Sequence, residues 1–391
     1  MPYTPKAAAV RQKFISTFGD TGRMVAVVRS PGRVNLIGEH TDYNDGYVFP
    51  AAVNLSIHVA VQRRTDTQVH VYSSLFEERV DYDLKSLRVE REHGWANYTK
   101  GVLNILTNRG WKLDGLNVYI DSDIPPGGGM SSSAALECAF AMACLALFPY
   151  QISRLDMAKA CQKAEHYVGI QCGIMDQFAS VFGKKGNGIF LDCRTMKFEH
   201  VPLPLDGHTI LVVNSRVKRS LATVEYNKRR KECEDVLKLL KTRFPGIRAL
   251  RDLENEDMNK ALAGTPEPHK SRAWHVAMEC RRTRKAVEVL RQGDLPAFGR
   301  LMNESHASLR DLYQVSCPEL DALAEVAQGV KGVIGARMMG GGFGGCLIAI
   351  AQKDAVESLK HELSHMYLKR FAATPEFHEV STEDGTEEYK P

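Results

Sequence analysis

Apolar residues recur at helical spacing in several stretches of the chain. The pattern predicts amphipathic helices over residues 7–18 and 157–168, each followed by a glycine that can end it, and another helix over 95–106. Residues 134–148 are the most apolar stretch, and they predict a buried helix because a membrane span needs roughly 20 such residues. The second half has two more amphipathic helices, whose apolar faces are formed by Cys233, Val236, Leu237 and Leu240 and by Cys280, Thr283, Val287 and Leu290.

Alternation with a period of two predicts strands. Residues 55–61 and 68–72 alternate in this way, and we expect them to form adjacent antiparallel strands. Residues 254–270 are typical of a loop or weak helix, and the charged, aperiodic segment 382–391 predicts a frayed tail. Short apolar runs predict further strands at 24–28, 116–120, 190–192, 209–213, 332–338 and 346–351.

The chain is too long for one ordinary hydrophobic core. Its 391 residues favour two domains of a little under 200 residues each. The proline-containing segment Val201-Pro-Leu-Pro-Leu-Asp-Gly207 is the best candidate for the junction. We therefore expect one domain over 1–205 and a second over 206–391, each mixing strands and helices.

Composition and charge exclude several classes of protein. With 44% hydrophobic and 25% charged residues the chain is typical of a globular protein, and its net charge of +4 gives no indication of nucleic-acid binding. The nine cysteines are scattered and never spaced as Cys-x-x-Cys, which favours buried thiols in a reducing cytoplasm. Residues 1–10 lack the pattern of a signal peptide, and we expect no membrane partner. Nothing in the sequence sets the oligomeric state, and a monomer is the expectation.

A glycine-rich turn precedes the apolar helix at 134–148. The predicted strand 116–120 is followed by Pro125 and Pro126, three glycines and the serines at 131–133. One of these serines can cap the helix, whose free N–H groups and positive dipole end would then face an anion held on the turn. The alternative is a tight turn with no ligand. Neither the Walker nor the dinucleotide-binding pattern is present, so a phosphate site of another kind is predicted.

A polar loop and a second glycine-rich turn add to this chemistry. Residues 34–46 contain Glu39, His40 and Asp42, and two acceptors with a switchable donor suit the recognition of neighbouring hydroxyls. A solvated polar loop is the alternative. The second turn lies at 340–345. Together these segments predict a nucleotide phosphate site beside a pocket for a polar small molecule.

Several motifs carry a family resemblance. Pro31-Gly-Arg-Val-Asn-Leu-Ile-Gly-Glu-His-Thr-Asp-Tyr-Asn44 resembles the galactokinase signature. The turn at 125–135 resembles the phosphate loop of the wider family of galactokinase, homoserine kinase, mevalonate kinase and phosphomevalonate kinase, and 335–345 resembles its third motif. The segments at 95–98, 172–178 and 220–226 are also similar to galactokinases. The chain is therefore identified as a member of this family from about residue 27 to residue 351.

The resemblance implies a fold and an activity. It implies two α+β domains, the first like domain 2 of ribosomal protein S5 and the second ferredoxin-like, with substrates in the cleft between them. The implied reaction transfers phosphate from ATP, with Mg²⁺, to the anomeric hydroxyl of α-D-galactose, the first committed step of galactose catabolism. A kinase for another sugar, such as N-acetylgalactosamine, is one alternative. A non-catalytic galactose and ATP sensor is the other, but such relatives lack part of the Ser-Ser-Ala-Ala run that is intact here.

The resemblance also implies roles for single residues. Asp176 matches the catalytic base and Arg33 the arginine beside it. The sugar-binding positions are matched by Glu39, His40, Asp42, Gly173 through its backbone, and Tyr226. Ser133 and Glu165 match the metal ligands. The ATP-binding positions are matched by Trp95 and Tyr98 beside adenine, and by Pro126, Gly127, Gly128, Gly129, Met130, Ser131, Ser132, Ser133 and Ala134 at the phosphates.

For some of these residues a purely structural role is the alternative. Asp176 could cap a helix, Tyr226 could be a packed aromatic, and Trp95 and Tyr98 could belong to the core. The sequence also departs from the family at two places. The spacing from Glu165 to Asp176 is one residue short, which would turn Glu165 by about 100° if the deletion lay within its helix. Met339 stands where a threonine is usual.

Overall fold

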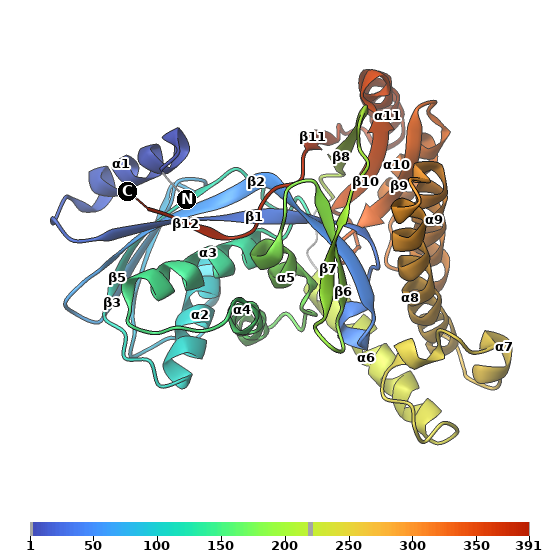
Figure 1. Ribbon diagram of the computed structural model, residues 1–391, viewed down its shortest axis with the longest axis horizontal. Helices are drawn as coiled ribbons and strands as arrows, with labels where there is room; N and C mark the ends of the chain where they lie inside the picture. Colours follow the sequence, from blue (N-terminus) through green and yellow to red (C-terminus); the bar gives the residue numbers. More distant parts are fainter. Residues whose placement is uncertain (1–2, 218–221, 391) are drawn as a thin grey trace.

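The structure is a computed structural model that describes residues 3–217 and 222–390. Figure 1 shows two halves side by side along the longest axis of the molecule. One half is built on a large sheet that contains two long strands, β1 and β2. The other half is built on a smaller sheet with long helices beside it. Among the described residues, none of the helices combines the length and the apolarity that a bilayer-spanning helix requires.

The larger sheet carries the first half of the chain. In the described residues its main strand order is β12, β1, β2, β5, β3, β4. Two further strands branch from this order: β6 pairs with the start of β2, and β7 pairs with β6. The bounds of these strands are β1 Val25–Ile37, β2 Tyr47–Arg63, β3 Gln68–Ser73, β4 Glu78–Asp83, β5 Leu116–Ser122, β6 Asn187–Asp192, β7 Phe198–Pro202 and β12 Glu387–Tyr389.

Helices cover both faces of this sheet. Val28 and Val59 point to one face, against α3, whereas their neighbours Val27 and Ala60 point to the other, against α1. The helix α3 is buried along most of its length, as the apolar stretch predicts. The bounds of the helices are α1 Pro5–Phe18, η1 Asp42–Asn44, η2 Arg91–Ala96, α2 Asn97–Asn108, α3 Ser132–Leu147, α4 Arg154–Val168 and α5 Met175–Phe182.

Two of the strand predictions are wrong in part. The strands at 55–61 and 68–72 exist as parts of β2 and β3, but they are not adjacent, because β5 lies between them and pairs in parallel with β3. The short strand expected at 24–28 is the start of β1, which continues to Ile37 through two irregularities in its register. The polar loop expected from residue 34 therefore begins only at Gly38, since local alternation does not reveal bulges.

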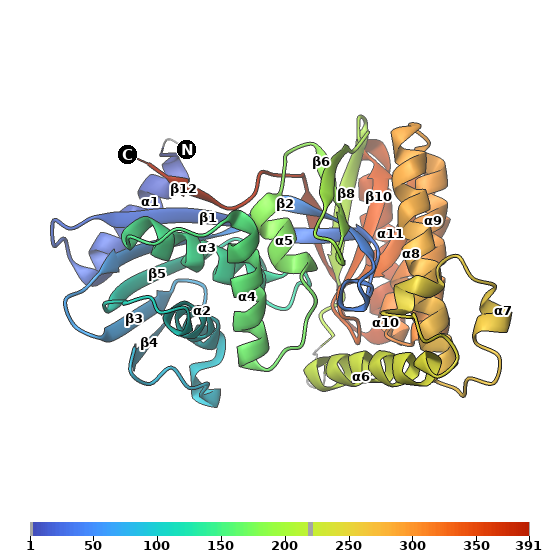
Figure 2. The ribbon, with the colours of Figure 1, turned by 60° about the horizontal axis from the view of Figure 1, so that its bottom comes forward.

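The smaller sheet carries most of the second half. Within the described residues it has the antiparallel order β11, β8, β10, β9. Figure 2 shows α8 and α9 side by side, and α9 packs on β9 of this sheet. Its strands are β8 His208–Asn214, β9 Val333–Met339, β10 Cys346–Gln352 and β11 Glu376–Val380. The helices are α6 Ala222–Lys241, η3 Leu250–Leu253, α7 Met258–Ala261, α8 His269–Arg291, α9 Leu295–Ser308, η4 Leu309–Tyr313, α10 Pro318–Gly329, η5 Lys353–Ala355 and α11 Val356–Phe371.

The predicted frayed tail is wrong. After β11 the chain crosses back to the larger sheet, where β12 pairs with β1 and Tyr389 lies opposite Val27. Thr386 is fully buried, and its hydroxyl donates to the carbonyl of Ser180. Backbone pairing and one buried aromatic ring thus hold a segment whose charged sequence is typical of disorder.

Candidate active site

The glycine-rich turn lies between β5 and α3. Gly127 and Gly129 have positive φ angles of 70° and 64°, which glycine adopts at little cost. The turn packs against β1: the backbone N–H of Arg33 donates to the carbonyl of Met130 at 3.1 Å, and its Nη1 donates to the carbonyl of Gly129 at 2.7 Å. A side chain at Gly32 would meet the Met130 carbonyl, so a glycine lets strand and turn come together.

The serines that follow do not cap α3 with their side chains. Ser131 takes the N-cap position with φ 55° and makes no side-chain cap bond. Its hydroxyl donates to Oδ2 of Asp176 at 2.6 Å, and the hydroxyl of Ser133 donates to Oε1 of Glu165 at 2.8 Å. The expectation of a serine cap is therefore wrong, because Ser131 has a left-handed backbone instead of the extended one of a capping serine, and its hydroxyl is directed at Asp176. The positive end of the helix dipole remains directed at the turn.

Asp176 and Arg33 form a close pair. Nε and Nη2 of Arg33 lie 2.8 and 2.7 Å from Oδ1 of Asp176, while Ser131 occupies Oδ2. Arg33 is almost fully buried, whereas about a quarter of the Asp176 side chain is exposed. Asp176 lies in the first turn of α5 but accepts from Arg33 and Ser131, so it is not a helix cap. The Asp176 carboxylate is thus bound to Arg33 and also lines a cavity.

This cavity, the sugar-side cavity, measures about 180 Å³. It brings together residues that lie far apart in sequence, including both catalytic candidates and every candidate for sugar binding. It also has lining residues that sequence reasoning did not single out, among them Cys172, Met175 and Thr223. The predicted residues on its wall are Arg33, Glu39, His40, Asp42, Glu165, Gly173, Asp176 and Tyr226.

Asp42 and Gly173 fit together closely. Asp42 accepts hydrogen bonds from the backbone N–H groups of Tyr43 at 3.1 Å and Met175 at 3.3 Å. Burial, followed by the nearby charge of Asp176, raises the pKa of Asp42 to about 6. A Cβ atom at Gly173 would lie 1.9 Å from Oδ2 of Asp42. Only glycine therefore allows this backbone to border the cavity.

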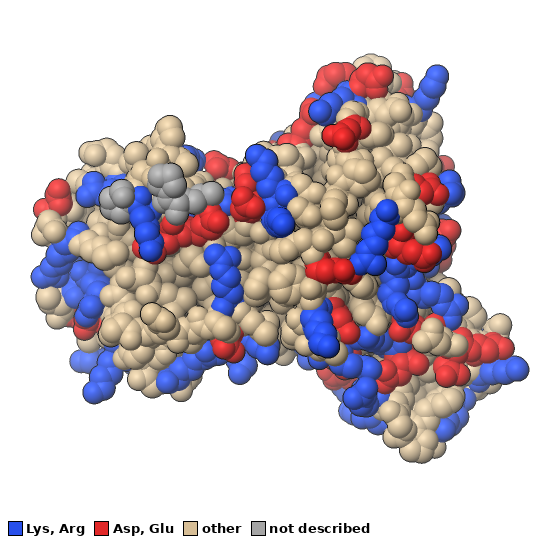
Figure 3. Space-filling model, viewed as in Figure 1, with Lys and Arg blue, Asp and Glu red and all other residues tan. Residues whose placement is uncertain are grey.

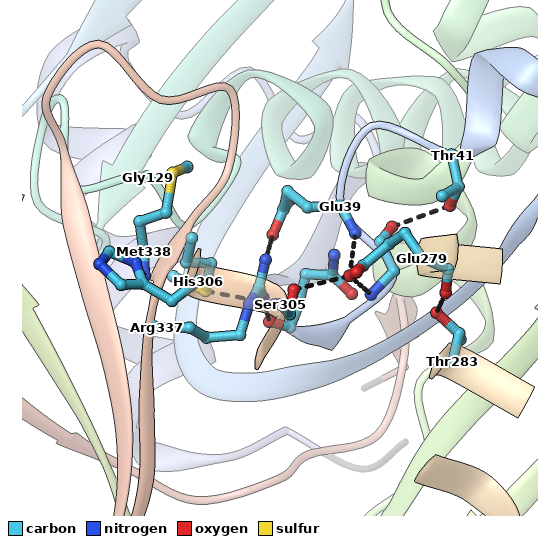
Figure 4. Close-up of polar contacts among 12 residues, drawn as sticks. Glu39, Thr41, Gly129, Glu279, Thr283, Ser305, His306, Arg337 and Met338 are labelled. Carbon is cyan, nitrogen blue, oxygen red and sulfur yellow. Dashed lines mark hydrogen bonds and ion pairs between the residues drawn. The ribbon is translucent and has the colours of Figure 1, made fainter. Parts of the chain in front are cut away.

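Glu39 is held by a residue that sequence analysis missed. Its carboxylate pairs with Arg337 on β9, which is completely buried and also donates from Nη1 to the carbonyl of Asn35 at 2.8 Å. Figure 4 shows the guanidinium of Arg337 directed at Glu39. Arg337 precedes the second glycine-rich turn within the motif at 335–345, but the motif alone does not reveal its distant partner.

His40 and Tyr226 form an aromatic wall. The ring centroids of the two residues are 5.5 Å apart, and Nδ1 of His40 shares a hydrogen bond of 2.8 Å with the hydroxyl of Tyr43. Burial, followed by the charges of His275 and Arg229, lowers the pKa of His40 well below its usual value, so the ring is neutral. Its Nε2 is buried without a partner in the described residues. A ligand in the cavity can satisfy that atom.

The segment at 220–226 is described only in part, because Ser220 and Leu221 lie outside the described residues. Tyr226 lies in the part that is described, on α6. It also faces the second glycine-rich turn, where a Cβ atom at Gly341 would lie 3.2 Å from its ring. Gly340, Gly341 and Gly342 complete this wall of the sugar-side cavity.

A second cavity of about 200 Å³ lies beside the glycine-rich turn between β5 and α3, which we call the phosphate turn after its expected ligand. Trp95 and Tyr98 both line it, although Trp95 belongs to the short η2 turn and Tyr98 to α2. Phe76 stacks on Trp95 with ring centroids 6.0 Å apart. Both predicted aromatics also touch the core, which was the alternative expectation. The turn contributes Pro126, Gly127, Ser132 and Ser133 to this wall, and Ser131 of the same turn contacts Asp176 on the wall of the sugar-side cavity.

Glu165 faces the phosphate turn. The helix α4 runs unbroken to Val168 and ends at Gly169, whose φ is 110°. The hydroxyl of Ser133 reaches the Glu165 carboxylate at 2.8 Å, so Glu165 is not turned away from the glycine-rich turn. Burial, followed by the charge of Asp176, raises the pKa of Glu165 to about 7. Its Oε2 accepts from the side chain of Gln177 at 2.5 Å.

One oxygen pair could help to hold a divalent cation. Within the part of the chain that the structure describes, no group of three or more His, Cys, Asp or Glu residues is arranged around a common metal position. Ser133 Oγ and Glu165 Oε1, 2.8 Å apart, are nevertheless hard oxygen donors beside the phosphate turn. Mg²⁺ commonly takes one or two protein oxygens and completes its shell with phosphate and water, so the donor set fits.

Met339 ends β9 next to the second glycine-rich turn. It is fully buried, and its sulfur accepts a contact of 3.2 Å from the backbone N–H of Asn35. The thioether therefore packs between β9 and β1. This position connects the two halves of the chain.

Family models match three parts of the chain. The model of the galactokinase galactose-binding signature matches residues 12–63. The models of the N-terminal and C-terminal domains of GHMP kinases match residues 97–184 and 286–369. These spans contain the polar loop, the phosphate turn with Asp176, and the second glycine-rich turn.

Individual proteins match over nearly the whole chain. A galactokinase of Thermotoga neapolitana is 44% identical over 92% of this chain and 99% of its own length. A galactokinase of Roseiflexus sp. is 42% identical over 96% of this chain and 95% of its own.

Solved structures agree with these matches. The crystal structure of Lactococcus lactis galactokinase complexed with galactose superposes with a TM-score of 0.92 at 39% identity, covering 98% of this chain and all of that one. A mevalonate kinase of Methanococcus jannaschii shares the fold at 17% identity, with a TM-score of 0.64. It covers 93% of this chain and 99% of its own. By sequence and fold, the chain belongs to the galactokinase family.

Proposed function

We propose that this protein is a galactokinase, which transfers the γ-phosphoryl group of ATP to the anomeric hydroxyl of α-D-galactose. The products are galactose 1-phosphate and ADP, and the reaction begins galactose catabolism. The observation that carries the proposal is the position of Asp176, which lies beside the phosphate turn and faces the sugar-side cavity.

Asp176 acts as the general base. A sugar hydroxyl is a poor nucleophile, and a carboxylate within hydrogen-bond reach that accepts its proton contributes about 10² to 10⁴ in rate. Arg33, 2.7 Å from Oδ1, stabilises the ionised carboxylate and offsets charge on the transferring phosphoryl group. Asp176 thus takes the proton while Arg33 balances the negative charges around it.

The polar residues of the sugar-side cavity recognise galactose. Glu39 and Asp42 accept hydrogen bonds from sugar hydroxyls, and the free Nε2 of His40 satisfies another hydroxyl. Gly173 contributes its backbone and Tyr226 its ring and hydroxyl. A sugar epimer would leave buried acceptors unpaired, which is costly, and selectivity follows from that cost.

The second cavity takes the adenine of ATP. The phosphate turn, residues 126–134, holds the phosphates through its backbone and the start of α3. Trp95 and Tyr98 offer flat apolar faces to the base. Replacement of Trp95 by Ala should raise the KM for ATP and leave that for galactose unchanged, and the reverse pattern in steady-state kinetics would reject this assignment.

Ser133 and Glu165 hold Mg²⁺ together with the phosphates. Their two oxygens are the hard donors beside the phosphate turn. The ion supplies charge neutralisation at the β- and γ-phosphates when it is bound. Glu165, on the unbroken helix α4, keeps its carboxylate directed at Ser133, which is the arrangement that this role requires.

The two halves form separate domains, residues 1–205 and 206–391. The first has a fold like domain 2 of ribosomal protein S5, and the second is ferredoxin-like, a proposal supported by its four-stranded antiparallel sheet with β8 and β10 at the centre. The last strand, β12, packs on the first domain. Superposition of each half on solved domains of these folds tests the assignment, and a different strand order would reject it.

The protein acts as a monomer in the cytoplasm. All nine cysteines are free, which supports a reducing compartment. Light scattering should give a mass near 43.6 kDa, and cell fractionation should recover the protein with cytoplasmic enzymes. A dimer mass or recovery in another fraction would reject the respective statement.

Galactose-dependent release of ADP tests the catalytic function. We expect release with Mg²⁺-ATP and galactose and little release without the sugar. The intact Ser132-Ser133-Ala134-Ala135 run and the paired Asp176 favour this result over that of a sensor. Saturable binding of galactose and ATP without ADP release would reject the enzyme in favour of the sensor.

A further inference from the structure

The helix α8, in the second half, holds the backbone of the polar loop that begins at Gly38. The N–H groups of Gly38 and Glu39 donate to Oε1 of Glu279, on α8, at 3.0 and 3.3 Å. One turn earlier on the same helix, Nε2 of His275 lies 3.2 Å from the carbonyl of Glu39. Both backbone groups of Glu39 are thus bound to α8, 236 and 240 residues along the chain.

Glu279 is buried and charged. Its side chain has no exposed surface, and it pairs with Arg282 and accepts from Ser305 on α9 at 2.7 Å. Burial alone would raise its pKa, but Arg282, followed by His275 and Arg337, lowers the pKa of Glu279 to about 2. Figure 4 shows this carboxylate at the centre of the contacts with the loop. With that pKa the carboxylate is an ionised acceptor at neutral pH.

The loop approaches α8 closely. Gly38 has φ 96°, and a Cβ atom there would lie 3.0 Å from the hydroxyl of Thr283. His275, Glu279 and Thr283 are four residues apart and share one face of the helix. This face fits the backbone of the loop rather than an apolar surface, which accounts for a threonine on the predicted apolar face.

Glu39 is consequently fixed at two points. Its backbone is bound to Glu279 and its carboxylate to Arg337. Removing one partner of a buried charged contact is strongly disruptive, because the other partner is left uncompensated. Small displacements of a binding group weaken recognition markedly. Glu279 is not among the residues that line the cavity, so it can act on a ligand there only through the loop.

We propose that Glu279 is a positioning residue for galactose, holding the backbone of Gly38 and Glu39 so that the Glu39 carboxylate faces the sugar. The inference rests on the proposed galactose kinase activity. It assigns sugar affinity to a helix outside the sugar-side cavity. It also separates sugar affinity from ATP affinity, because α8 contributes no residue to the second cavity.

Steady-state kinetics of Glu279→Gln test the proposal. The amide keeps the size of the side chain but removes the charge that strengthens its two bonds to the loop. We expect the KM for galactose to rise roughly ten- to hundredfold, with the KM for ATP and kcat within about twofold. The matched control is Glu304→Gln, because Glu304 approaches the same Arg282 at 3.7 Å from an exposed position and makes no hydrogen bond to the loop among the described residues. Its galactose KM should stay that of the wild type.

A purely structural role predicts a different pattern. Loss of stability alone would lower the active fraction and leave both KM values unchanged, and that result would overturn the proposal. If Glu279→Gln does not fold, Ser305→Ala removes one donor to the same carboxylate, and a galactose KM unchanged in that variant would overturn it equally. An inactive wild-type protein would instead reject the kinase function, so the two failures are distinguishable.

Discussion

Asp176, the proposed general base, is held by contacts on both of its carboxylate oxygens. Arg33 takes one oxygen and Ser131 the other, so the side chain is fixed on two sides while part of it remains open to the cavity. The sequence could suggest this aspartate only through its family motif. The pairing itself joins residues 143 positions apart, which no local pattern reveals.

Replacement of Asp176 by Asn should remove the base and preserve the shape of the site. We expect kcat to fall by about 10² to 10⁴, while the Kd for galactose changes little, because the polar residues that bind the sugar remain. Asp81→Asn, at an exposed ion pair with Arg79, is the control and should be fully active. A kcat near the wild-type value for Asp176→Asn would discard this residue as the base.

If Asp42 binds the sugar as proposed, galactose binding should depend on pH. Its pKa is raised to about 6, so the carboxylate is ionised at pH 7.5 and becomes protonated as the pH falls through 6. Because a protonated carboxyl loses acceptor capacity, the Kd for galactose should be about tenfold weaker at pH 5. Calorimetry without nucleotide or metal measures this Kd directly. Equal Kd values at pH 5 and 7.5 would contradict the role of Asp42, and Asp42→Asn should bind weakly at both.

Other residues of the site could not be found from the sequence. Glu39, His40 and Asp42 stand close together in one motif, which makes them visible. Arg337 and Glu279 lie on β9 and α8, and their relation to Glu39 exists only after the two halves pack. The charge of each gives no indication of burial, since buried charged residues are uncommon.

At the scale of elements, the site depends on where strands and helices end. β1 passes through the signature motif and delivers Arg33 to the phosphate turn, while α3 begins directly after that turn. Hydrophobic periodicity predicted α3, α4, α6 and α8, because each buries one stripe or a whole surface. It did not predict that β5 separates β2 from β3, since strand partners are set by packing and not by alternation.

The helix α4 allows a prediction about the metal. Glu165 on this helix lies opposite Ser133, 2.8 Å away, although the sequence left its orientation open. Replacing a residue that contacts a metal only through another ligand already weakens metal affinity about tenfold or more. We therefore expect Glu165→Gln to raise the Mg²⁺ concentration for half-maximal activity at least about tenfold. Glu357→Gln, at an exposed ion pair with Lys360, serves as the control. An unchanged Mg²⁺ dependence would remove Glu165 from the metal site.

At the scale of the whole molecule, the sugar-side cavity belongs to both halves. Arg33, Asp42 and Asp176 come from the first half, whereas Tyr226 and Gly340–Gly342 come from the second. The return of β12 to the first sheet joins the halves again at the end of the chain. The sequence predicted two halves and their motifs, but the fit of one to the other depends on long-range contacts.

The surface agrees with small-molecule substrates. Figure 3 shows basic and acidic side chains interspersed over much of the face drawn there. This mixture accords with the net charge of only +4. Steering of a polyanion such as nucleic acid would instead favour a single-sign patch. The charges that matter for the reaction are the few held inside the cavities.

The product of one incubation with Mg²⁺-ATP and a panel of hexoses tests the central claim most directly. Phosphorus and proton NMR should detect a phosphate ester at C1 of α-D-galactose. The rate should be much higher with galactose than with glucose or N-acetylgalactosamine, because the buried acceptors Glu39 and Asp42 match one arrangement of hydroxyls. Equal rates on all three sugars, or phosphate at another carbon, would contradict the account.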